Sequence, residues 1–251
     1  MIGSPDPLYQ NLRRDLKILG TWDDHDYGVN DGGFEYEFKE EAQRLYLDFW
    51  GSSQNDKRRS QEGTYFNNIL NIDGLKVNII GLDTRYFRST TKSRKDNYEP
   101  VNKNNITMLG EDQWLWLNDV ISQEADLIIL LSSVQVLPTG HSWEKWNIFP
   151  TERTKLLNLL EKEETKTIIL SGDRHKAGFY EYGELFEISS SSLNMEKFKT
   201  GMAAVAPVAK VAGVSIERTT AMLGLLTDNN IDASKAGNGM KNVFLALSKN
   251  G

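Results

Sequence analysis

The residues best suited to chemistry are crowded into one short segment, Thr21–Gly33, which directly follows an apolar run. It holds four aspartates, one histidine and one asparagine. Carboxylate oxygens beside an imidazole suit a divalent or ferric cation, and without a cation the neighbouring carboxylates would repel one another. The structural alternative is an Asp-rich turn that caps a helix beginning near Phe34. We favour the metal site because ordinary turns seldom place a histidine between two carboxylates.

A second group of this kind, Ser171–His175, also follows an apolar run. Asp173 and His175 lie on one side of a short turn, so both side chains can converge on a single site. The planar guanidinium of Arg174 suits the oxygens of a phosphate. A surface turn with a chance salt bridge is the alternative interpretation.

Two further segments carry weaker signals at the ends of apolar runs. Asp83 and Arg85 form an Asp-x-Arg pair, which is often only an ion pair that holds a loop. Ser133 and Gln135 are equally compatible with hydrogen bonding at the edge of the core. Neither pair identifies a site by itself.

The third histidine, His141, lies in a segment with two tryptophans. It is equally compatible with a functional role and with a structural hydrogen bond. Of Trp143 and Trp146, we expect at least one to belong to the core. All three histidines of the chain fall in segments that follow predicted strands.

Four short apolar runs precede the polar segments and predict buried strands, because strands buried on both faces are continuous in apolar character. They are Leu16–Trp22, Val77–Leu82, Leu127–Leu131 and Thr165–Leu170. Alternation of strands with helices predicts an α/β sheet with helices on its faces, and ligands of such sheets gather at the carboxyl ends of the strands. The polar stretches 51–63 and 89–107 are interpreted as solvated connections; a border of the substrate cleft is the alternative.

Helical periodicity appears in two of the intervening stretches. In residues 111–121 the apolar face comprises Trp114, Leu117 and Ile121. In residues 151–164 it comprises Leu156, Leu159 and Leu160, and Thr151, after Pro150, is the predicted N-cap.

Composition narrows the functional classes. The 251 residues carry a formal net charge of −6, and the pI near 5.3 argues against a broad electrostatic footprint for nucleic acid. Cysteine is absent, which excludes disulfides, thiolate ligands and a cysteine nucleophile. No apolar run approaches the roughly 18–20 residues needed to span a bilayer, and the first residues do not form a signal peptide. These features do not define the cellular compartment of the protein.

Eight motifs, taken in order, resemble the PhoD-like alkaline phosphatase/phosphodiesterase family. They are TWDDHDYGVNDGG, EFKEEAQRLYLDFWG, LDTRYFR, MLGEDQWLWL, SSVQVLP, WEKW with F-P-x-E-R, LSGDRH and SSSLN. The resemblance runs from about Tyr9 to Asn194. The family belongs to the calcineurin-like metallophosphoesterases, which have a layered α/β core and a multi-metal site. It implies a partial metallophosphoesterase-like sheet with flanking helices over residues 1–197.

The resemblance also implies roles for the residues of the first two groups. Asp24 corresponds to a metal ligand and His25 to the histidine near the leaving group, with Asp26 orienting His25. Asp173 and His175 correspond to ligands in the late histidine-containing motif.

The remaining assignments are less direct. Asp23 joins the metal ligands, and Arg174 or Arg85 would clamp the phosphate oxygens. Gln135 falls near the place of a separate histidine ligand and is grouped with His141 and Asn30 as substrate-binding. The implied reaction is attack by a metal-activated water on a small phosphoester. The family implies iron and calcium; zinc, manganese and magnesium remain open.

The sequence departs from the family pattern because it begins after the first metal-binding residue and a G-D-x-x-Y motif whose aspartate bridges the metals. We therefore expect weak or no activity from this chain alone. The alternative function is a catalytically inactive remnant that serves only as a structural or interaction module.

After Ser192–Asn194 the resemblance stops, and the sequence becomes rich in alanine, valine and glycine. Residues 202–249 resemble phage tail tape measure proteins through VAGVSIE, LGLLTDN and SKAG. The stretch predicts three short helices: Gly213 ends the first, Ser215 caps the second, and Asp232 or Ser234 caps the third. Residues 198–251 are thus predicted as an all-α segment. We interpret it as joined by a fusion; a native helical extension of the hydrolase, or a phage structural protein, is the alternative.

Overall fold

The computed structural model describes residues 16–91, 98, 100–101, 105–190, 195–211, 213–214, 219 and 233–249. The chain divides into two compact units. The first comprises Met1–Asp173 with Phe179–Ile188, and the second comprises Arg174–Gly178 with Ser189–Gly251.

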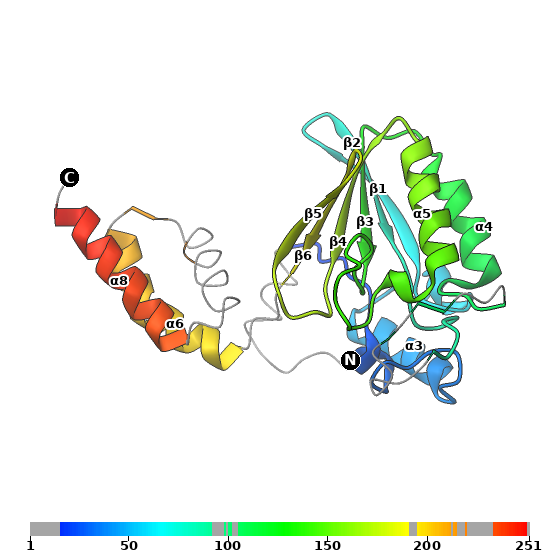
Figure 1. The fold of residues 1–251 in the computed structure, drawn as a ribbon, viewed down its shortest axis with the longest axis horizontal. Helices are drawn as coiled ribbons and strands as arrows, with labels where there is room; N and C mark the ends of the chain where they lie inside the picture. The colour runs from blue at the N-terminus through cyan, green and yellow to red at the C-terminus, as the bar shows by residue number, and fades with distance from the viewer. Residues whose placement is uncertain are drawn as a thin grey trace. The chain divides into compact units, whose positions relative to one another are not determined.

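A six-stranded mixed sheet forms the centre of the first unit (Figure 1). Its strands stand in the order β1-β2-β3-β4-β6-β5. β1 and β2 form an antiparallel hairpin, whereas β2, β3 and β4 are parallel to one another. The bounds are β1 Phe66–Ile72, β2 Leu75–Gly81, β3 Leu127–Ser132, β4 Lys166–Ser171, β5 Gly178–Tyr182 and β6 Leu185–Ser189.

The hairpin between β1 and β2 turns at Asp73 and Gly74, whose φ angles are 51° and 89°. A type I′ hairpin turn matches the strand twist and needs positive φ at both central positions, where Asp-Gly is a preferred pair. The Asn71 side chain accepts a hydrogen bond from the Gly74 N–H at 3.0 Å, which closes the turn. Local chemistry therefore fixes the register of this edge of the sheet.

Three of the four predicted strands are confirmed as β2, β3 and β4. The prediction of a strand at Leu16–Trp22 is wrong, since the described residues there have no strand. Leu16 is largely exposed and Trp22 is buried, and the Thr21 hydroxyl donates to the Leu82 carbonyl at 2.5 Å. The segment is thus held at a strand end by side chains, with no ladder of its own.

Helices α4 (Gly110–Ile121) and α5 (Pro150–Lys162) cover one face of the sheet (Figure 1). The predicted apolar face of α4 is confirmed. In α5, Leu156, Leu157 and Leu160 are buried while Leu159 is only partly so. The N-cap of α5 is Phe149 rather than Thr151, because Pro150 takes the first helical position, where its fixed φ and missing N–H cost least.

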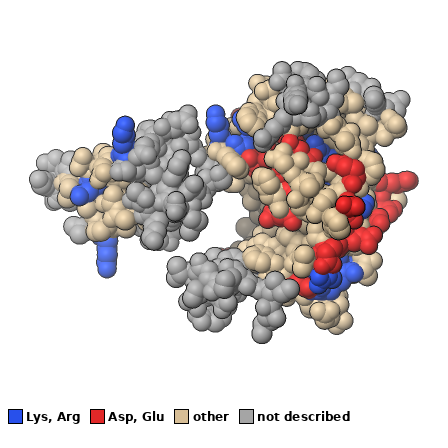
Figure 2. All heavy atoms as spheres, turned by 90° about the horizontal axis from the view of Figure 1, so that it is seen from below, with Lys and Arg blue, Asp and Glu red and all other residues tan. Residues whose placement is uncertain are grey.

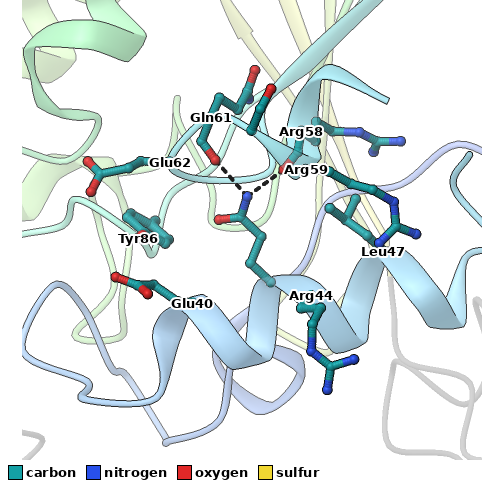
Figure 3. A pocket seen from close by; sticks show the side chains of 10 residues that line it. Glu40, Arg44, Leu47, Arg58, Arg59, Gln61, Glu62 and Tyr86 are labelled. Carbon is teal, nitrogen blue, oxygen red and sulfur yellow. Dashed lines mark hydrogen bonds between the residues drawn. The ribbon is translucent and has the colours of Figure 1, made fainter. Parts of the chain in front are cut away.

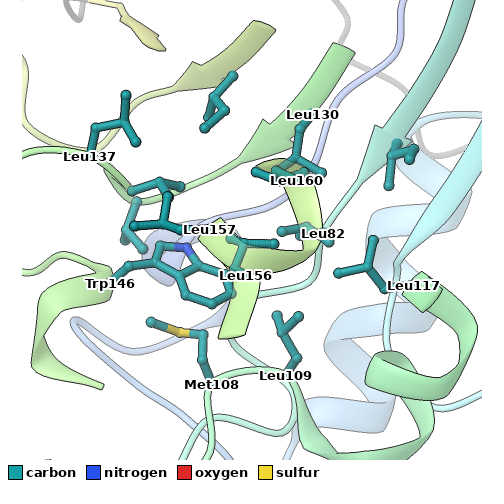
Figure 4. Packing of buried hydrophobic residues seen from close by; sticks show 14 of the residues in the cluster. Leu82, Met108, Leu109, Leu117, Leu130, Leu137, Trp146, Leu156, Leu157 and Leu160 are labelled. Carbon is teal, nitrogen blue, oxygen red and sulfur yellow. The ribbon is translucent and has the colours of Figure 1, made fainter. Parts of the chain in front are cut away.

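The core lies between these helices and the parallel strands (Figure 4). Leu82 and Leu130 of the sheet region pack with residues of both helices and with Trp146, which is fully buried. Trp143 is 47% exposed, so one of the two tryptophans is core, as predicted. The short helix η3 (Trp146–Ile148) begins at this anchor.

A separate aromatic cluster supports the strand ends. It joins α2 (Asp24–Tyr27), α3 (Lys39–Phe49) and the segment after β2. Its buried members are Trp22, Tyr27, Tyr46, Leu47 and Tyr86. The 3₁₀ turn η1 (Lys57–Arg59) follows α3.

In the second unit, α6 (Met195–Val211) packs against α8 (Ala233–Lys249). The buried contact residues are apolar: Val205, Ala209, Ala236, Met240 and Phe244. α6 ends as predicted, with Gly213 at φ 68°. Ser215, Asp232 and the Ser234 side chain lie outside the described residues, as does the predicted middle helix. Within the described part of the chain, no helix is long and apolar enough to cross a membrane.

Candidate functional site

The Asp-rich segment forms the four-residue helix α2, and the helix on its C-terminal side begins at Lys39 instead of near Phe34. Asp24 is buried, and both of its oxygens accept backbone N–H groups, from His25 at 2.7 Å and from Asp31 at 3.0 Å. The His25 ring is largely exposed, with Nδ1 at 3.5 Å from Asp24 Oδ1. Asp24 is therefore a rigidly held, buried carboxylate next to an accessible imidazole.

Asp26 has a different partner from the one predicted. Its Oδ2 accepts the backbone N–H of Asp23 at 3.2 Å, which is the reciprocal contact of a capping box. The carboxylate paired with the His25 ring is that of Asp24. The geometry thus makes Asp26 a helix-capping residue.

Asp23 takes part in a buried ion-pair network at the end of β2. Arg85 is fully buried and donates through Nε to Asp23 Oδ1 at 2.8 Å. The same guanidinium makes a bidentate contact with Glu144, at 3.1 Å and 2.6 Å. Arg88 also pairs with Glu144 and donates to the Asp31 carbonyl at 2.8 Å. Glu144 therefore lies between two guanidinium groups, and Arg85 between two carboxylates.

Hydroxyl groups extend this network to β3. Ser133 donates to Asp23 Oδ1 at 2.7 Å, and its oxygen lies 2.5 Å from that of Thr84. Both hydroxyl residues are buried. The Asp23 carboxylate is therefore oriented by residues that follow two adjacent parallel strands.

Asp83 does not pair with Arg85 through side chains. Its Oδ1 accepts the backbone N–H groups of Arg85 and Tyr86, both at 2.9 Å, and its Oδ2 accepts that of Thr64 at 2.7 Å. A carboxylate that accepts several backbone donors holds a turn in place. Asp83 therefore shapes the loop that presents Arg85.

Asp173 follows β4 in the left-handed region, at φ 61°, which aspartate tolerates better than most residues. Burial, followed by the negative charges of Asp23 and Glu144, raises the pKa of Asp173 to about 7, against the lowering effect of Arg85. Burial also raises the pKa of Asp23, again opposed by Arg85. Burial, more than the surrounding charges, therefore opposes ionisation of these two carboxyl groups.

Arg174 and His175 belong to the segment 174–178, which is part of the second unit. His175 is exposed and has φ 54°, whereas Arg174 is half-buried. Their roles as phosphate contact and metal ligand stay predictions.

The structure brings Gln135 and His141 together. Gln135 is buried, and its Oε1 lies 2.9 Å from Nε2 of His141. His141 Nδ1 accepts the backbone N–H of Trp143 at 3.2 Å, and the Gln135 amide nitrogen lies 3.4 Å from the Tyr180 hydroxyl. Asn30 is exposed and donates to Asp31 Oδ2 at 2.5 Å.

The chemical types of these residues and their arrangement in space give different answers on whether they could bind a cation. Buried, hard carboxylate oxygens with incompletely offset charge suit a divalent or trivalent cation. Among the described residues, however, no group of three or more His, Cys, Asp and Glu side chains is arranged so that it could hold a metal ion. The chemistry of the donors fits, and the described part of the chain supplies only part of a coordination shell.

Sequence reasoning did not single out Glu144, Arg88 or Asp31. Glu144 lies in the WEKW motif between two tryptophans, and Arg88 follows Arg85 by three residues. A charged residue inside an aromatic segment is a usable signal of a buried pair, but its partner is 59 residues away. Asp31 contributes a positive φ of 57° and accepts from the Tyr98 hydroxyl.

A separate hollow of about 290 Å³ lies between α3 and residues 58–62 (Figure 3). Gln43 donates to the carbonyls of Arg58 and Gln61, at 2.5 Å and 2.8 Å, and so holds that loop. The arginines of its lining all pair with carboxylates, in the pairs Arg44–Glu41, Arg58–Asp56 and Arg59–Asp48. This hollow therefore offers less to a phosphate than its arginine content suggests.

Figure 2 shows the molecule from below the view of Figure 1, from the side on which α3 lies. On this side, Asp and Glu side chains outweigh Lys and Arg side chains on the surface of the first unit. An anionic substrate on this side would meet an acidic surface, and its binding would need cations placed locally.

Comparison with known proteins separates the two parts of the chain. Residues 188–251 match the family model for phage-related minor tail proteins. None of the curated proteins matches the chain.

Among solved structures, one described as "Structure of PhoD" is similar at a TM-score of 0.51 and 18% sequence identity. The similarity covers 68% of this chain but only 39% of that chain. At this identity the likeness shows the fold, and the predicted α/β architecture with flanking helices is confirmed.

Proposed function

We propose that residues 1–197 carry a metal-dependent phosphoester hydrolase domain of PhoD type, acting on a small phosphomonoester or phosphodiester. The observation that carries the proposal is the cluster of buried and half-buried carboxyl groups at the ends of β2, β3 and β4. Asp23, Asp24 and Glu144 lie near Asp173 there, and the buried Arg85 and Arg88 form ion pairs with Glu144. A cation would offset the excess negative charge, and the PhoD-like fold supports the choice of reaction.

Asp24 and Asp173 would hold the cation, with Asp23 and His175 as further ligands. A bound cation would supply Lewis-acid polarisation of a phosphoryl oxygen and would lower the pKa of a water molecule. Iron and calcium are the proposed ions on the family resemblance; zinc, manganese and magnesium are outcomes for the test.

The accessible ring of His25 is proposed to donate a proton to the leaving oxygen. Arg174 is proposed to contact the non-bridging oxygens. Arg85 is a weaker choice for that clamp, because Asp23 and Glu144 already take its guanidinium. Gln135, His141 and Asn30 remain proposed substrate contacts.

The test is hydrolysis of bis-p-nitrophenyl phosphate and p-nitrophenyl phosphate by the full chain, with each of the five ions in turn. We expect weak, metal-dependent turnover that Asp24→Asn and His175→Ala abolish. Asp126→Asn is the matched control: Asp126 accepts the Lys76 N–H at 2.7 Å, at the opposite end of the same parallel strands. Turnover that survives Asp24→Asn, or none in the wild-type chain, would reject the proposal.

A specific observation favours one alternative, a hydrolase remnant without activity. No three-ligand group is assembled within the described residues. If that alternative holds, the chain binds no metal, and Asp24→Asn leaves every measured property except stability unchanged.

For the second unit we propose a structural role of the tail-protein kind. The match of residues 188–251 to phage-related minor tail proteins supports it, as does a helix pair whose contact is built from apolar residues. Helical self-association without metal, measured by analytical ultracentrifugation of the full chain, is the expected result. A chain that stays monomeric at every concentration would count against it.

A further inference from the structure

Glu144 has an unusual environment for a residue outside the proposed ligand set. It is 2% exposed, and its two partners, Arg85 and Arg88, are 0% and 2% exposed. Taking charges out of water is costly, and a buried ion pair is often no more stabilising than apolar side chains of similar volume. The burial of this cluster therefore calls for an explanation beyond stability.

The charges are connected in a line that ends at Asp23. Arg85 joins Asp23 to Glu144, and Arg88 makes a second contact with Glu144. Glu144 thus determines how much of the positive charge of Arg85 is left to offset Asp23. Without that carboxylate, Arg85 would keep its ion pair with Asp23 and lose its ion pair with Glu144.

The position of Glu144 is also firmly fixed. Two residues later, the Trp146 backbone N–H donates to the Gln135 carbonyl at 2.9 Å, and its indole N–H donates to Ser132 Oγ at 3.0 Å. Trp146 is itself part of the hydrophobic core. The backbone that carries the Glu144 carboxylate is therefore held rigidly near the end of β3. A side chain that orients another side chain needs such a fixed position.

We propose that Glu144 is a positioning residue. Through Arg85 it fixes the orientation of the Asp23 carboxylate and keeps the negative charge of Asp23 available to a cation. The inference rests on the proposed function, since it assumes that a cation binds next to Asp23. Residues that orient metal ligands typically alter metal affinity by roughly 10–100-fold when they are replaced.

The test is calorimetric titration of the full chain with Mn²⁺ alone. Glu144→Gln keeps the shape of the side chain and removes its charge, so we expect Mn²⁺ affinity to fall by about tenfold or more. Glu144→Asp keeps the charge, and its affinity should lie between those of Glu144→Gln and the wild type. The melting temperature of each metal-free protein is measured alongside.

Glu152→Gln is the matched control. Glu152 accepts hydrogen bonds from the Thr107 hydroxyl at 2.6 Å, from the Met108 N–H at 2.6 Å and from the Trp114 indole at 2.9 Å. The hydrogen-bond donors to Glu152 are neutral groups, whereas those to Glu144 are the guanidinium groups of arginines. We expect this variant to lower the melting temperature and to leave Mn²⁺ affinity unchanged.

Ser133→Ala keeps the test decisive should Glu144→Gln fail to fold. It removes the second donor to Asp23 without leaving a buried charge unpaired, and it should weaken Mn²⁺ binding by roughly tenfold. If the folded variants bind Mn²⁺ as tightly as the wild type, the role of Glu144 is overturned while the proposed function stands. If the wild type binds no Mn²⁺, the proposed function fails and the inference falls with it.

Discussion

The strand ends of the first unit and the helix pair of the second bury opposite kinds of side chain. Arg85, Arg88 and Glu144 are almost completely buried at the strand ends. The contact between α6 and α8 is built from apolar side chains and from close approach at Gly201 and Gly237. Burying charge is costly, so this concentration of charge makes the strand ends the candidate functional region of the first unit.

The comparison also separates two kinds of packing. The helix pair needs only apolar faces and small residues, and any sequence with that pattern would pack similarly. The strand ends need particular partners, since removal of one charge leaves another unpaired. Substitutions in the two regions should therefore differ in size and in kind.

The largest effect is expected from Arg85→Met. Asp23 would lose its ion pair, and Glu144 would keep only Arg88, so the free energy of unfolding should fall by about 3–5 kcal/mol. Denaturant unfolding of the first unit measures it. A loss below about 1 kcal/mol would show that these charges are not energetically coupled.

A smaller effect is expected at the helix contact. A Cβ at Gly237 would lie 2.5 Å from the Gly201 carbonyl oxygen, which is backbone and cannot move aside. Gly237→Ala should destabilise the helix pair by about 1–3 kcal/mol, although alanine favours helix. Thermal unfolding followed by circular dichroism measures the change, and an unchanged or raised midpoint would contradict the packing described.

The matched substitution two residues further along α8 should have the opposite sign. Nothing lies within 4 Å of a Cβ at Gly239, so Gly239→Ala should stabilise the helix by about 0.5–1 kcal/mol. The same thermal measurement serves. Equal losses at both glycines would mean that helix propensity and contact geometry are not what separates them.

The smallest effect is expected from an exposed ion pair in the first unit. Lys76 and Glu124 lie 3.1 Å apart, with 40% and 91% of their side-chain surfaces exposed. Lys76→Gln should change the free energy of unfolding by less than about 0.5 kcal/mol. A loss as large as that of Arg85→Met would remove the contrast between buried and exposed charge.

Much of the sheet could be predicted from the sequence because parallel strands buried by helices are continuous apolar runs. β3 and β4 are clear cases. β1 was beyond this reasoning, since its sequence FNNILNI mixes asparagine with apolar residues in a hairpin at the sheet edge. Leu16–Trp22 has strand-like composition, yet nothing in a local pattern shows whether a ladder partner exists.

The candidate site was predictable in its residue types and less so in its pairing. DDHD and GDRH lie beyond apolar runs, and that placement points to the strand ends. The contact between Arg85 and Glu144 joins positions 59 residues apart, which no local pattern encodes. The partner of Asp26 was likewise not predictable, because an aspartate at this position can either cap α2 or orient the His25 imidazole.

Elemental analysis of the purified full chain, after equilibration with each candidate ion, measures whether the carboxyl groups at the strand ends bind a metal. We predict stoichiometric metal in the wild type and in Asp126→Asn, and its loss in Asp24→Asn. Metal absent from the wild type would show that these carboxyl groups do not bind a cation, and metal retained equally by Asp24→Asn would show that Asp24 is not a ligand.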